Sequence, residues 1–327
     1  MAEKKELAVT EEKVVEIEME RLRSFENHPF KVKADSQMIE LQESVKKYIL
    51  LITGYVSRRQ NMPFAANYSC RPYRRMHELV QSGELGEIKR VNWIITDWYR
   101  TQYYYNSGDW RGTWDGEGGG VLLNQCPHQL DLLQWICGMP EKVRAYCHEG
   151  KWHDIEVEDD VTAYLEYPNG ATGVFVTSTG EAPGTNRFEI DLTKGRLVCE
   201  KGVLSCYRME DEREFMFSAT EGFAMPKGES FDPELDGKNP DHQGVMQAFV
   251  NRILFGTPLV AEGTEGIRGL TLSNAIHLSS WLGREVTIPL DEDLFLAELN
   301  KKRATSKKKT NVKEVTLSTE GTYGTYK

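Results

Sequence analysis

From residue 72 onward, hydrophobic and polar positions recur in patterns that predict regular elements. Residues 72–83 (PYRRMHELVQSG) place apolar side chains at helical spacing and end at Gly83, which predicts an amphipathic helix. Residues 86–100 combine alternating with continuous apolar positions, which is typical of a partly buried strand. Helical spacing returns over residues 241–255, 262–281 and 291–302.

Short strand patterns follow one another between these helices, at residues 142–149, 160–168, 171–179, 186–193 and 196–200. Turn sequences such as Pro168-Asn169-Gly170 and Lys194-Gly195 separate them. Strands joined by short turns run antiparallel, because a parallel connection needs a crossover of a dozen or more residues. The pattern therefore predicts an open, mostly antiparallel sheet and an α+β fold class.

The first 47 residues differ from the rest of the chain. They are rich in Glu and Lys, and the first glycine of the chain is Gly54. Residues 14–22 alternate like a short strand, residues 36–47 show helical spacing, and residues 49–70 lose any period. We predict a small irregular α/β segment over residues 1–48 and a junction over residues 49–72.

Composition narrows the function classes. The formal net charge of -10 argues against nucleic acid or an anionic membrane as a partner. No apolar run approaches the length of a membrane span, and the charged N-terminus lacks the apolar core of a signal peptide. The six cysteines fall in no C-x-x-C pattern and are expected to be reduced, buried thiols. We expect a cytoplasmic protein.

The strongest candidate chemistry lies in residues 118–135 (GGGVLLNQCPHQLDLLQW). Three glycines, which let a ligand approach the backbone, precede an apolar helical pattern. Helical spacing places Asn124, His128 and Asp131 along one side of this segment. His128 suits general acid–base catalysis on a hydroxyl group. The alternative is a structural role near the helix start, where Pro127 takes the first helical position.

The loop before this segment is aromatic and suits the apolar faces of a sugar ring. Arg111, beside Trp110, is a candidate for binding a phosphate, a carboxylate or a sugar hydroxyl, and a surface arginine packed on tryptophan is the alternative. His242 opens a helical pattern and is either a cap or a substrate contact. His148, Trp152 and His153 are expected to be exposed, and the carboxylates that follow them show no ligand spacing that predicts a metal site.

A dinucleotide cofactor needs a G-x-G-x-x-G loop directly after a first strand, so that the pyrophosphate binds at a helix N-terminus. No glycine precedes Gly54, and Val121 stands where DGEGGGV would need its third glycine. The chain also shows no Walker loop and no G-x-S-x-G elbow. We therefore predict no cofactor-binding residues in this chain.

From about residue 73 to the end, the chain resembles the Gfo/Idh/MocA family of NAD(P)-dependent sugar and polyol oxidoreductases. The resemblance rests on SGELGEIKRV (82–91), DWRGTW (109–114), residues 118–140, NRFEI (186–190) and residues 256–281. It implies the family's C-terminal domain over residues 73–303, with helices on one face of the sheet. The basic run and small polar residues at the end of the sequence predict a polar tail over residues 304–327. It also implies NAD or NADP as the cofactor, a sugar or polyol ligand, and homo-oligomers or pairing with a homologue through the sheet.

The family motif D-x-G-x-H falls on residues 124–128, which implies that His128 is the acid–base residue. Asn124 replaces the usual aspartate and can orient a substrate, but it cannot take a proton. The family's N-terminal Rossmann domain and its E-K-P segment are absent. Residues 14–48 instead resemble the start of a ParB-type N-terminal domain and stop before that family's arginine-rich box.

The resemblance therefore predicts a sugar or polyol oxidoreductase by descent with little autonomous turnover. The alternative is a non-catalytic carbohydrate-binding or oligomerisation module. A ParB-like regulator is disfavoured by the net negative charge of the chain and by the absence of that family's arginine-rich box.

Overall fold

The computed structural model describes residues 71–235, 241–259, 261–307, 309 and 312. The chain divides into two compact units, Met1–Arg59 and Gln60–Lys327, and all described residues belong to the second. The predictions for residues 1–70, including the ParB-like start and the junction up to residue 70, lie outside the described residues. So does the end of the predicted tail beyond residue 312.

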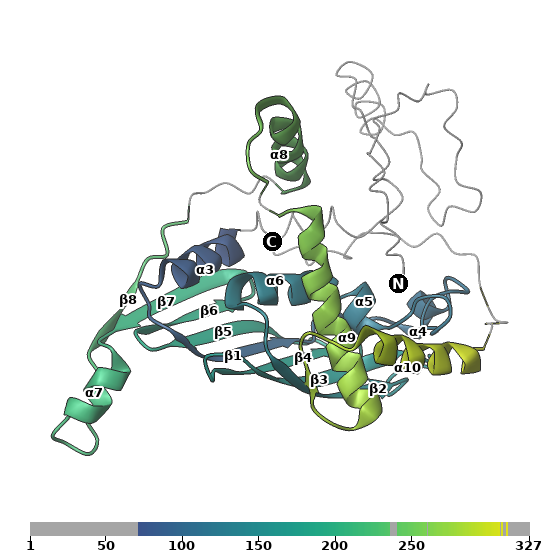
Figure 1. Cartoon of the computed structure of the whole chain (residues 1–327), viewed down its shortest axis with the longest axis horizontal. Coiled ribbons are helices and arrows are strands. Elements are labelled where there is room, and N and C mark those ends of the chain that lie inside the picture. Colours follow the sequence, from purple (N-terminus) through teal and green to yellow (C-terminus); the bar gives the residue numbers. More distant parts are fainter. Residues whose placement is uncertain (1–70, 236–240, 260, 308, 310–311, 313–327) are drawn as a thin grey trace, which may run out of the picture. The chain divides into compact units, whose positions relative to one another are not determined.

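Within the described residues, nine strands form one sheet in the order β8-β7-β6-β5-β1-β4-β3-β2-β9 (Figure 1). The strands are β1 (Ile88–Ile95), β2 (Lys142–Glu149), β3 (Glu158–Glu166), β4 (Thr172–Ser178), β5 (Asn186–Leu192), β6 (Gly195–Glu200), β7 (Val203–Met209), β8 (Gly228–Phe231) and β9 (Val286–Thr287). Neighbours pair antiparallel except β1 and β4, which run parallel. The predicted open, mostly antiparallel sheet is confirmed.

The two faces of the sheet differ because each strand alternates buried and exposed side chains. In β1, Trp93 is fully buried and stacks on Phe188 at 4.2 Å between ring centroids, whereas the adjacent Ile94 is 40% exposed. Tyr146 of β2 and Tyr164 of β3 are exposed as well. The face opposite the core therefore carries exposed apolar and aromatic side chains.

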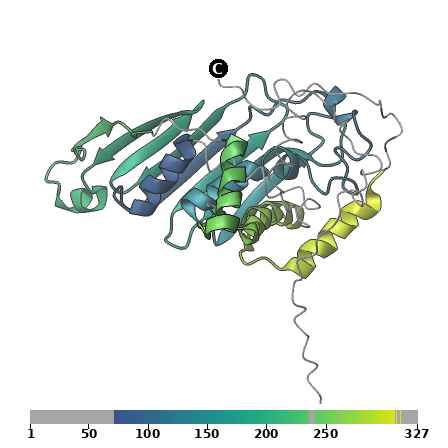
Figure 2. The same ribbon diagram turned by 90° about the horizontal axis from the view of Figure 1, so that it is seen from above.

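Helices cover the core face of the sheet, as the family resemblance implies (Figures 1 and 2). The covering helices are α3 (Arg71–Ser82), α6 (Pro127–Cys137) and α9 (Gly266–Leu282), with α3 packed on α6, α6 on α9, and α9 on β2. The predicted helix over residues 72–83 is confirmed, and it ends at Gly83 with a positive φ of 71°.

The remaining described helices are short or peripheral: α4 (Gln102–Tyr105), α5 (Val121–Asn124), α7 (Glu212–Ser218), α8 (Asp241–Phe255), η3 (Gly263–Glu265) and α10 (Glu292–Thr305). None of the helices in the described part of the chain has the length and apolar character that a membrane span requires. Among the described cysteines, Cys126, Cys199 and Cys206 are buried, as expected, whereas Cys137 and Cys147 are only partly buried.

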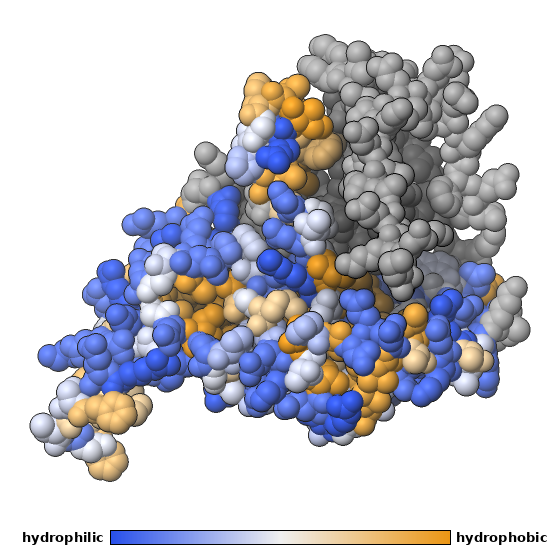
Figure 3. Space-filling view, in the orientation of Figure 1, coloured by the Kyte–Doolittle hydropathy of each residue, from blue (hydrophilic) through white to orange (hydrophobic). Residues whose placement is uncertain are grey.

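The sequence patterns missed an arm formed by β7, α7 and β8 at one end of the sheet. Figure 3 shows hydrophobic side chains at the tip of this arm, at the lower left. Met216, Phe217, Phe223 and Met225 are all exposed there. These side chains lack the burial period on which pattern recognition depends, so the arm gives little signal in the sequence.

Candidate functional site

The segment that carries Asn124 and His128 forms two helices rather than one. α5 ends at Asn124 and α6 begins at Pro127. The N–H of Cys126 bonds to the carbonyl of Val121 at 2.8 Å, which tightens the chain between the two helices. Proline has no N–H and disfavours helical angles in the residue before it. The predicted helical pattern is therefore interrupted between Asn124 and His128, whereas His128 and Asp131 both lie in α6.

The three polar residues have different surroundings. Asn124 joins a polar cluster with residues of the preceding loop. His128 is the second residue of α6 and is half-buried. Asp131 is only 3% exposed, accepts a hydrogen bond from Gln134 at 3.0 Å, and packs on Gly269 of α9. Asp131 thus contributes to the contact between α6 and α9, and its role at the substrate stays a prediction.

The hydroxyl group of Tyr104 in α4 is the centre of the polar cluster. It accepts a hydrogen bond from Nη1 of Arg111 at 2.7 Å and donates one to Oδ1 of Asn124 at 3.0 Å. Nε2 of Gln125 donates to the same Oδ1 at 2.9 Å. Nδ2 of Asn124 donates to Glu117. We call Tyr104, Arg111, Glu117, Asn124 and Gln125 the Tyr104 cluster.

Aromatic rings fix the position of Arg111. Its guanidinium carbon lies 4.5 Å from the ring centroid of Tyr104 and 4.3 Å from that of Trp110, within the range of cation–π attraction. Arg111 is thus both packed on tryptophan and part of a polar cluster. Burial raises the pKa of Tyr104, more than Arg111 lowers it, so the hydroxyl stays protonated near neutral pH and can donate to Asn124.

Glu117 is the titratable carboxyl group of the Tyr104 cluster. Its oxygens accept hydrogen bonds from the N–H of Gly112 at 2.6 Å and from Asn124. Burial raises the pKa of Glu117 to about 7, although these hydrogen bonds and Arg111 act in the opposite direction. Glu117 can therefore exchange a proton near neutral pH, which Asn124 cannot. The sequence analysis missed this residue, and an acidic residue directly before three glycines was the available signal.

A buried carboxylate on β3 holds the backbone that follows the glycines. Both oxygens of Glu158 lie 2.9 Å from the N–H of Gly120, and one accepts the N–H of Leu122 at 3.1 Å. Nε2 of His277 lies 3.0 Å from the same carboxylate, and both side chains are fully buried. A Cβ on Gly120 would lie 2.0 Å from the carbonyl oxygen of Glu158, so only glycine fits there.

This arrangement tests whether the glycines could bind a dinucleotide. The pyrophosphate of NAD(P) needs backbone N–H groups without another acceptor at a helix N-terminus. Glu158 already accepts the N–H groups of Gly120 and Leu122 at the start of α5. The glycine segment of the described domain therefore does not fit the pyrophosphate.

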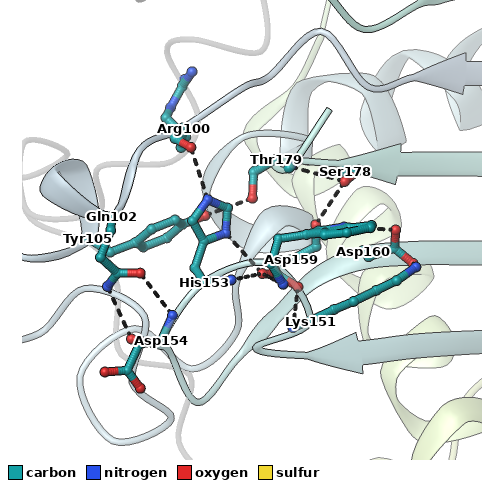
Figure 4. Close-up of polar contacts among 12 residues, drawn as sticks. Arg100, Gln102, Tyr105, Lys151, His153, Asp154, Asp159, Asp160, Ser178 and Thr179 are labelled. Atoms are coloured by element: carbon teal, nitrogen blue, oxygen red, sulfur yellow. Dashed lines mark hydrogen bonds and ion pairs between the residues drawn. The ribbon is translucent and has the colours of Figure 1, made fainter. Parts of the chain in front are cut away.

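A second polar network fixes the loop that carries Tyr104 (Figure 4). Nδ1 of His153 lies 2.9 Å from Asp159, and Nε2 lies 2.9 Å from the carbonyl oxygen of Arg100. Asp159 also accepts backbone N–H groups from residues 151–153, and Tyr105 bonds through its hydroxyl to Thr179 at 2.9 Å. The prediction that His153 is exposed is wrong, because its side chain is 6% exposed, whereas His148 and Trp152 are exposed as expected.

The segment after α10 lies against the loops of the candidate site. Ser306 donates to Glu156 at 2.5 Å through its hydroxyl, and Lys307 donates to Glu156 at 2.6 Å through its backbone N–H. Nζ of Lys309 donates to the carbonyl oxygen of Tyr105 at 2.8 Å. A cavity of about 530 Å³ lies between this segment and residues of the DWRGTW and β2–β3 loops. The described part of the predicted polar tail is therefore in contact with the domain.

The last predicted site residue, His242, is in the first turn of α8. Its side chain lies outside what the structure describes, so its predicted substrate contact stays a prediction.

Comparisons with known proteins agree with the fold. Residues 73–198 match the family model described as the GFO/IDH/MocA C-terminal domain. The chain is similar in structure to the WlbA dehydrogenases of Bordetella pertussis and Chromobacterium violaceum, both in complex with NADH and UDP-GlcNAcA. The identities are 25% and 27%, the TM-score is 0.55 in both cases, and the match covers 69% of this chain and 62% of each WlbA chain. Levoglucosan dehydrogenase in complex with NADH and levoglucosan shares the fold at 17% identity and a TM-score of 0.55, over 69% of this chain and 65% of that one.

Among curated proteins, trans-1,2-dihydrobenzene-1,2-diol dehydrogenase of Bos taurus is 28% identical over 122 residues, which are 37% of this chain and 33% of that protein. The chain spans half or less of the length of the curated relatives it matches. The predicted resemblance to the Gfo/Idh/MocA oxidoreductases is confirmed by the family model and by the structural neighbours, which include NADH-bound sugar dehydrogenases.

Proposed function

We propose that this chain binds a carbohydrate or polyol at the Tyr104 cluster, as the substrate half of an NAD(P)-dependent oxidoreductase. The observation that carries this proposal is a chain of hydrogen bonds: Arg111 and Asn124 both bond to the Tyr104 hydroxyl, and Asn124 also donates to Glu117. The cluster lies within the residues that match the family's C-terminal domain. The similarity to dehydrogenases that bind NADH and sugar ligands supports the ligand class.

The chemistry of the cluster suits sugar hydroxyl groups, which donate and accept hydrogen bonds at the same time. Arg111 and Gln125 supply donors, Glu117 supplies an acceptor, and the Trp110 ring offers an apolar face. His128, which follows Asn124 at the start of α6, is proposed to take the proton of the ligand hydroxyl group. Asn124 orients that hydroxyl group without taking its proton.

We infer little turnover by these 327 residues alone. The sequence holds no G-x-G-x-x-G loop, and Glu158 occupies the N–H groups at the glycine segment. Correct positioning of two reactants supplies about 7–11 kcal/mol of a barrier, so a substrate site without a placed hydride acceptor reacts slowly. A fluorescence titration with NADH tests this inference, and binding in the micromolar range contradicts it.

Isothermal titration calorimetry against monosaccharides and inositols tests the ligand proposal. We expect one class of sugar or polyol to bind, and we expect His128→Ala to weaken that binding by about tenfold or more, the loss of one good polar contact. His148→Ala is the matched control, because His148 is exposed on β2. The absence of binding across the panel, or equal losses in the two variants, would refute the proposal.

A second candidate role, assembly through the sheet, is favoured by the open face. Ile94, Tyr146 and Tyr164 are exposed there, and exposed apolar side chains on one face are typical of an interface. We propose a homo-oligomer, or a complex with a homologue, formed through this face. Analytical ultracentrifugation tests it: replacing Tyr146 and Tyr164 by glutamate should yield monomers, and an unchanged sedimentation profile contradicts the proposal.

A further inference from the structure

Three cationic side chains gather around Tyr104 and Tyr105. The guanidinium carbon of Arg100 lies 5.3 Å from the Tyr104 ring centroid, and that of Arg111 lies 4.5 Å from it. Lys309 donates to the carbonyl oxygen of Tyr105. Their hydrogen bonds within the described residues go to carbonyl and hydroxyl oxygens, and no described carboxylate lies within ion-pair distance of any of the three.

Several acidic groups lie near these cations. Glu117 interacts with both Arg111 and Lys309, but burial raises its pKa to about 7, so it is only partly ionised at neutral pH. Asp154 and Glu156 also act on Lys309, and Glu156 already accepts two hydrogen bonds from the segment after α10. Arg100 and Arg111 thus form no ion pair with a described carboxylate. Burial lowers the pKa of Lys309, and Glu117, Asp154 and Glu156 act in the opposite direction.

Arg111 and Lys309 also retain hydrogen-bonding capacity. A guanidinium group carries five N–H donors and an ammonium group carries three. Arg111 donates to the Tyr104 hydroxyl, and Lys309 donates to the Tyr105 carbonyl. The guanidinium group of Arg111 lies against two aromatic rings, and guanidinium groups bind planar or tetrahedral anions through two N–H groups.

We propose that the ligand of the Tyr104 cluster is a carbohydrate that carries an anionic group, either a carboxylate or a phosphate, and that Arg111 and Lys309 bind this group. The proposal rests on the proposed function and adds the class of ligand. It also makes the segment after α10 part of the site, because Ser306 and Lys307 anchor that segment to Glu156 beside Lys309.

Calorimetry with glucuronate, glucose 6-phosphate and neutral glucose tests the proposal on the full chain. We expect at least one anionic sugar to bind ten or more times more tightly than glucose, and to bind more weakly as salt rises from 50 to 500 mM. Lys309→Gln should weaken the binding of the anionic sugar about tenfold. Lys307→Gln is the matched control, because this exposed lysine holds Glu156 through its backbone only.

The outcomes separate the two proposals. Equal affinities for glucose and for both anionic sugars overturn the anionic class and leave the proposed function intact, whereas no binding of any sugar overturns both. Equal effects of Lys309→Gln and Lys307→Gln overturn the role of Lys309. Arg111→Gln gives a second measurement, with thermal unfolding to confirm that it folds. A preference for glucuronate or for glucose 6-phosphate identifies the anionic group as carboxylate or phosphate.

Discussion

Replacing Glu158 by glutamine removes the charge of a carboxylate that is fully buried beneath the glycine segment. In the native protein, this carboxylate accepts the N–H groups of Gly120 and Leu122 and lies 3.0 Å from Nε2 of His277. Glutamine keeps one acceptor oxygen and brings an NH₂ group into a site that consists of donors. At least one buried donor therefore loses its acceptor.

The magnitude follows from these contacts. A buried donor without an acceptor costs about 1–3 kcal/mol, and more where the lost acceptor was charged. Because at least one buried donor loses a charged acceptor, we expect Glu158→Gln to lower the free energy of unfolding by about 1–3 kcal/mol or more. That is a large share of the roughly 5–15 kcal/mol of a typical domain.

The pH dependence provides a second, independent signature of the same carboxylate. Burial alone would raise the pKa of Glu158, but His277 and the N–H of Leu122 outweigh it and hold the pKa below its usual value. A lowered pKa in the folded state stabilises the fold above the unfolded pKa of roughly 4.3, and this stabilisation is lost as pH falls through the folded pKa. Glu158→Gln removes this part of the acid sensitivity.

Urea unfolding at pH 7 and across the acid range measures both effects. Glu166→Gln is the matched control, because Glu166 lies on the same strand and forms a partly exposed ion pair with Lys142 at 3.2 Å. Exposed pairs contribute about 0–1 kcal/mol, so this control should unfold nearly like the native protein. A loss of less than 1 kcal/mol in Glu158→Gln, or a loss no larger than in the control, would refute the assigned role of the buried carboxylate.

Three further substitutions test other parts of the site. Because burial raises the pKa of Glu117 to about 7, the folded protein keeps a proton that the unfolded chain releases, so the free energy of unfolding falls as pH rises from about 4.5 to 7. In Glu117→Gln this fall, measured by urea unfolding at several pH values, should be smaller by about 2–3 kcal/mol. An unchanged pH dependence would contradict this prediction. His153→Ala should cost about 2–4 kcal/mol in thermal unfolding, against less than about 0.5 for the exposed His148→Ala, and similar losses would exclude a structural role for the buried histidine. Gly120→Ala places a Cβ 2.0 Å from a carbonyl oxygen of β3 and should cost about 1–3 kcal/mol or more, whereas Gly222→Ala meets open space and should unfold like the native protein.

The fold is predictable from sequence where its signals are local. The strand predicted at residues 142–149 coincides with β2 (Lys142–Glu149), because alternation with period two and flanking turn residues lie within the segment itself. The parallel pairing of β1 with β4 was not predicted, since the partners, such as Trp93 and Phe175, are far apart in the chain. No local pattern specifies which distant strand fills the position beside β1.

The site was predictable only in part, because burial and proximity decide which polar residues act together. Arg111 and Asn124 were recognised from motif and spacing, but Tyr104 and Glu117 were not, since a raised carboxyl pKa depends on burial that the sequence does not display. The interruption of the helix before Pro127 was not predicted, because helical spacing was extended across this proline, which disfavours helical geometry in the preceding residue.

The three glycines show how one sequence feature supports two opposite interpretations. In the sequence, a glycine run before a helix indicates that a ligand can approach the backbone. In the structure, the absence of a side chain at Gly120 instead lets the backbone of β3 approach closely. Glu158 accepts the N–H groups that a phosphate would need. A glycine run therefore indicates phosphate binding only when its N–H groups have no acceptor within the protein. In this chain the carboxylate of Glu158 occupies the N–H groups at the glycines. The proposed anionic group of the ligand is therefore assigned to Arg111 and Lys309 instead.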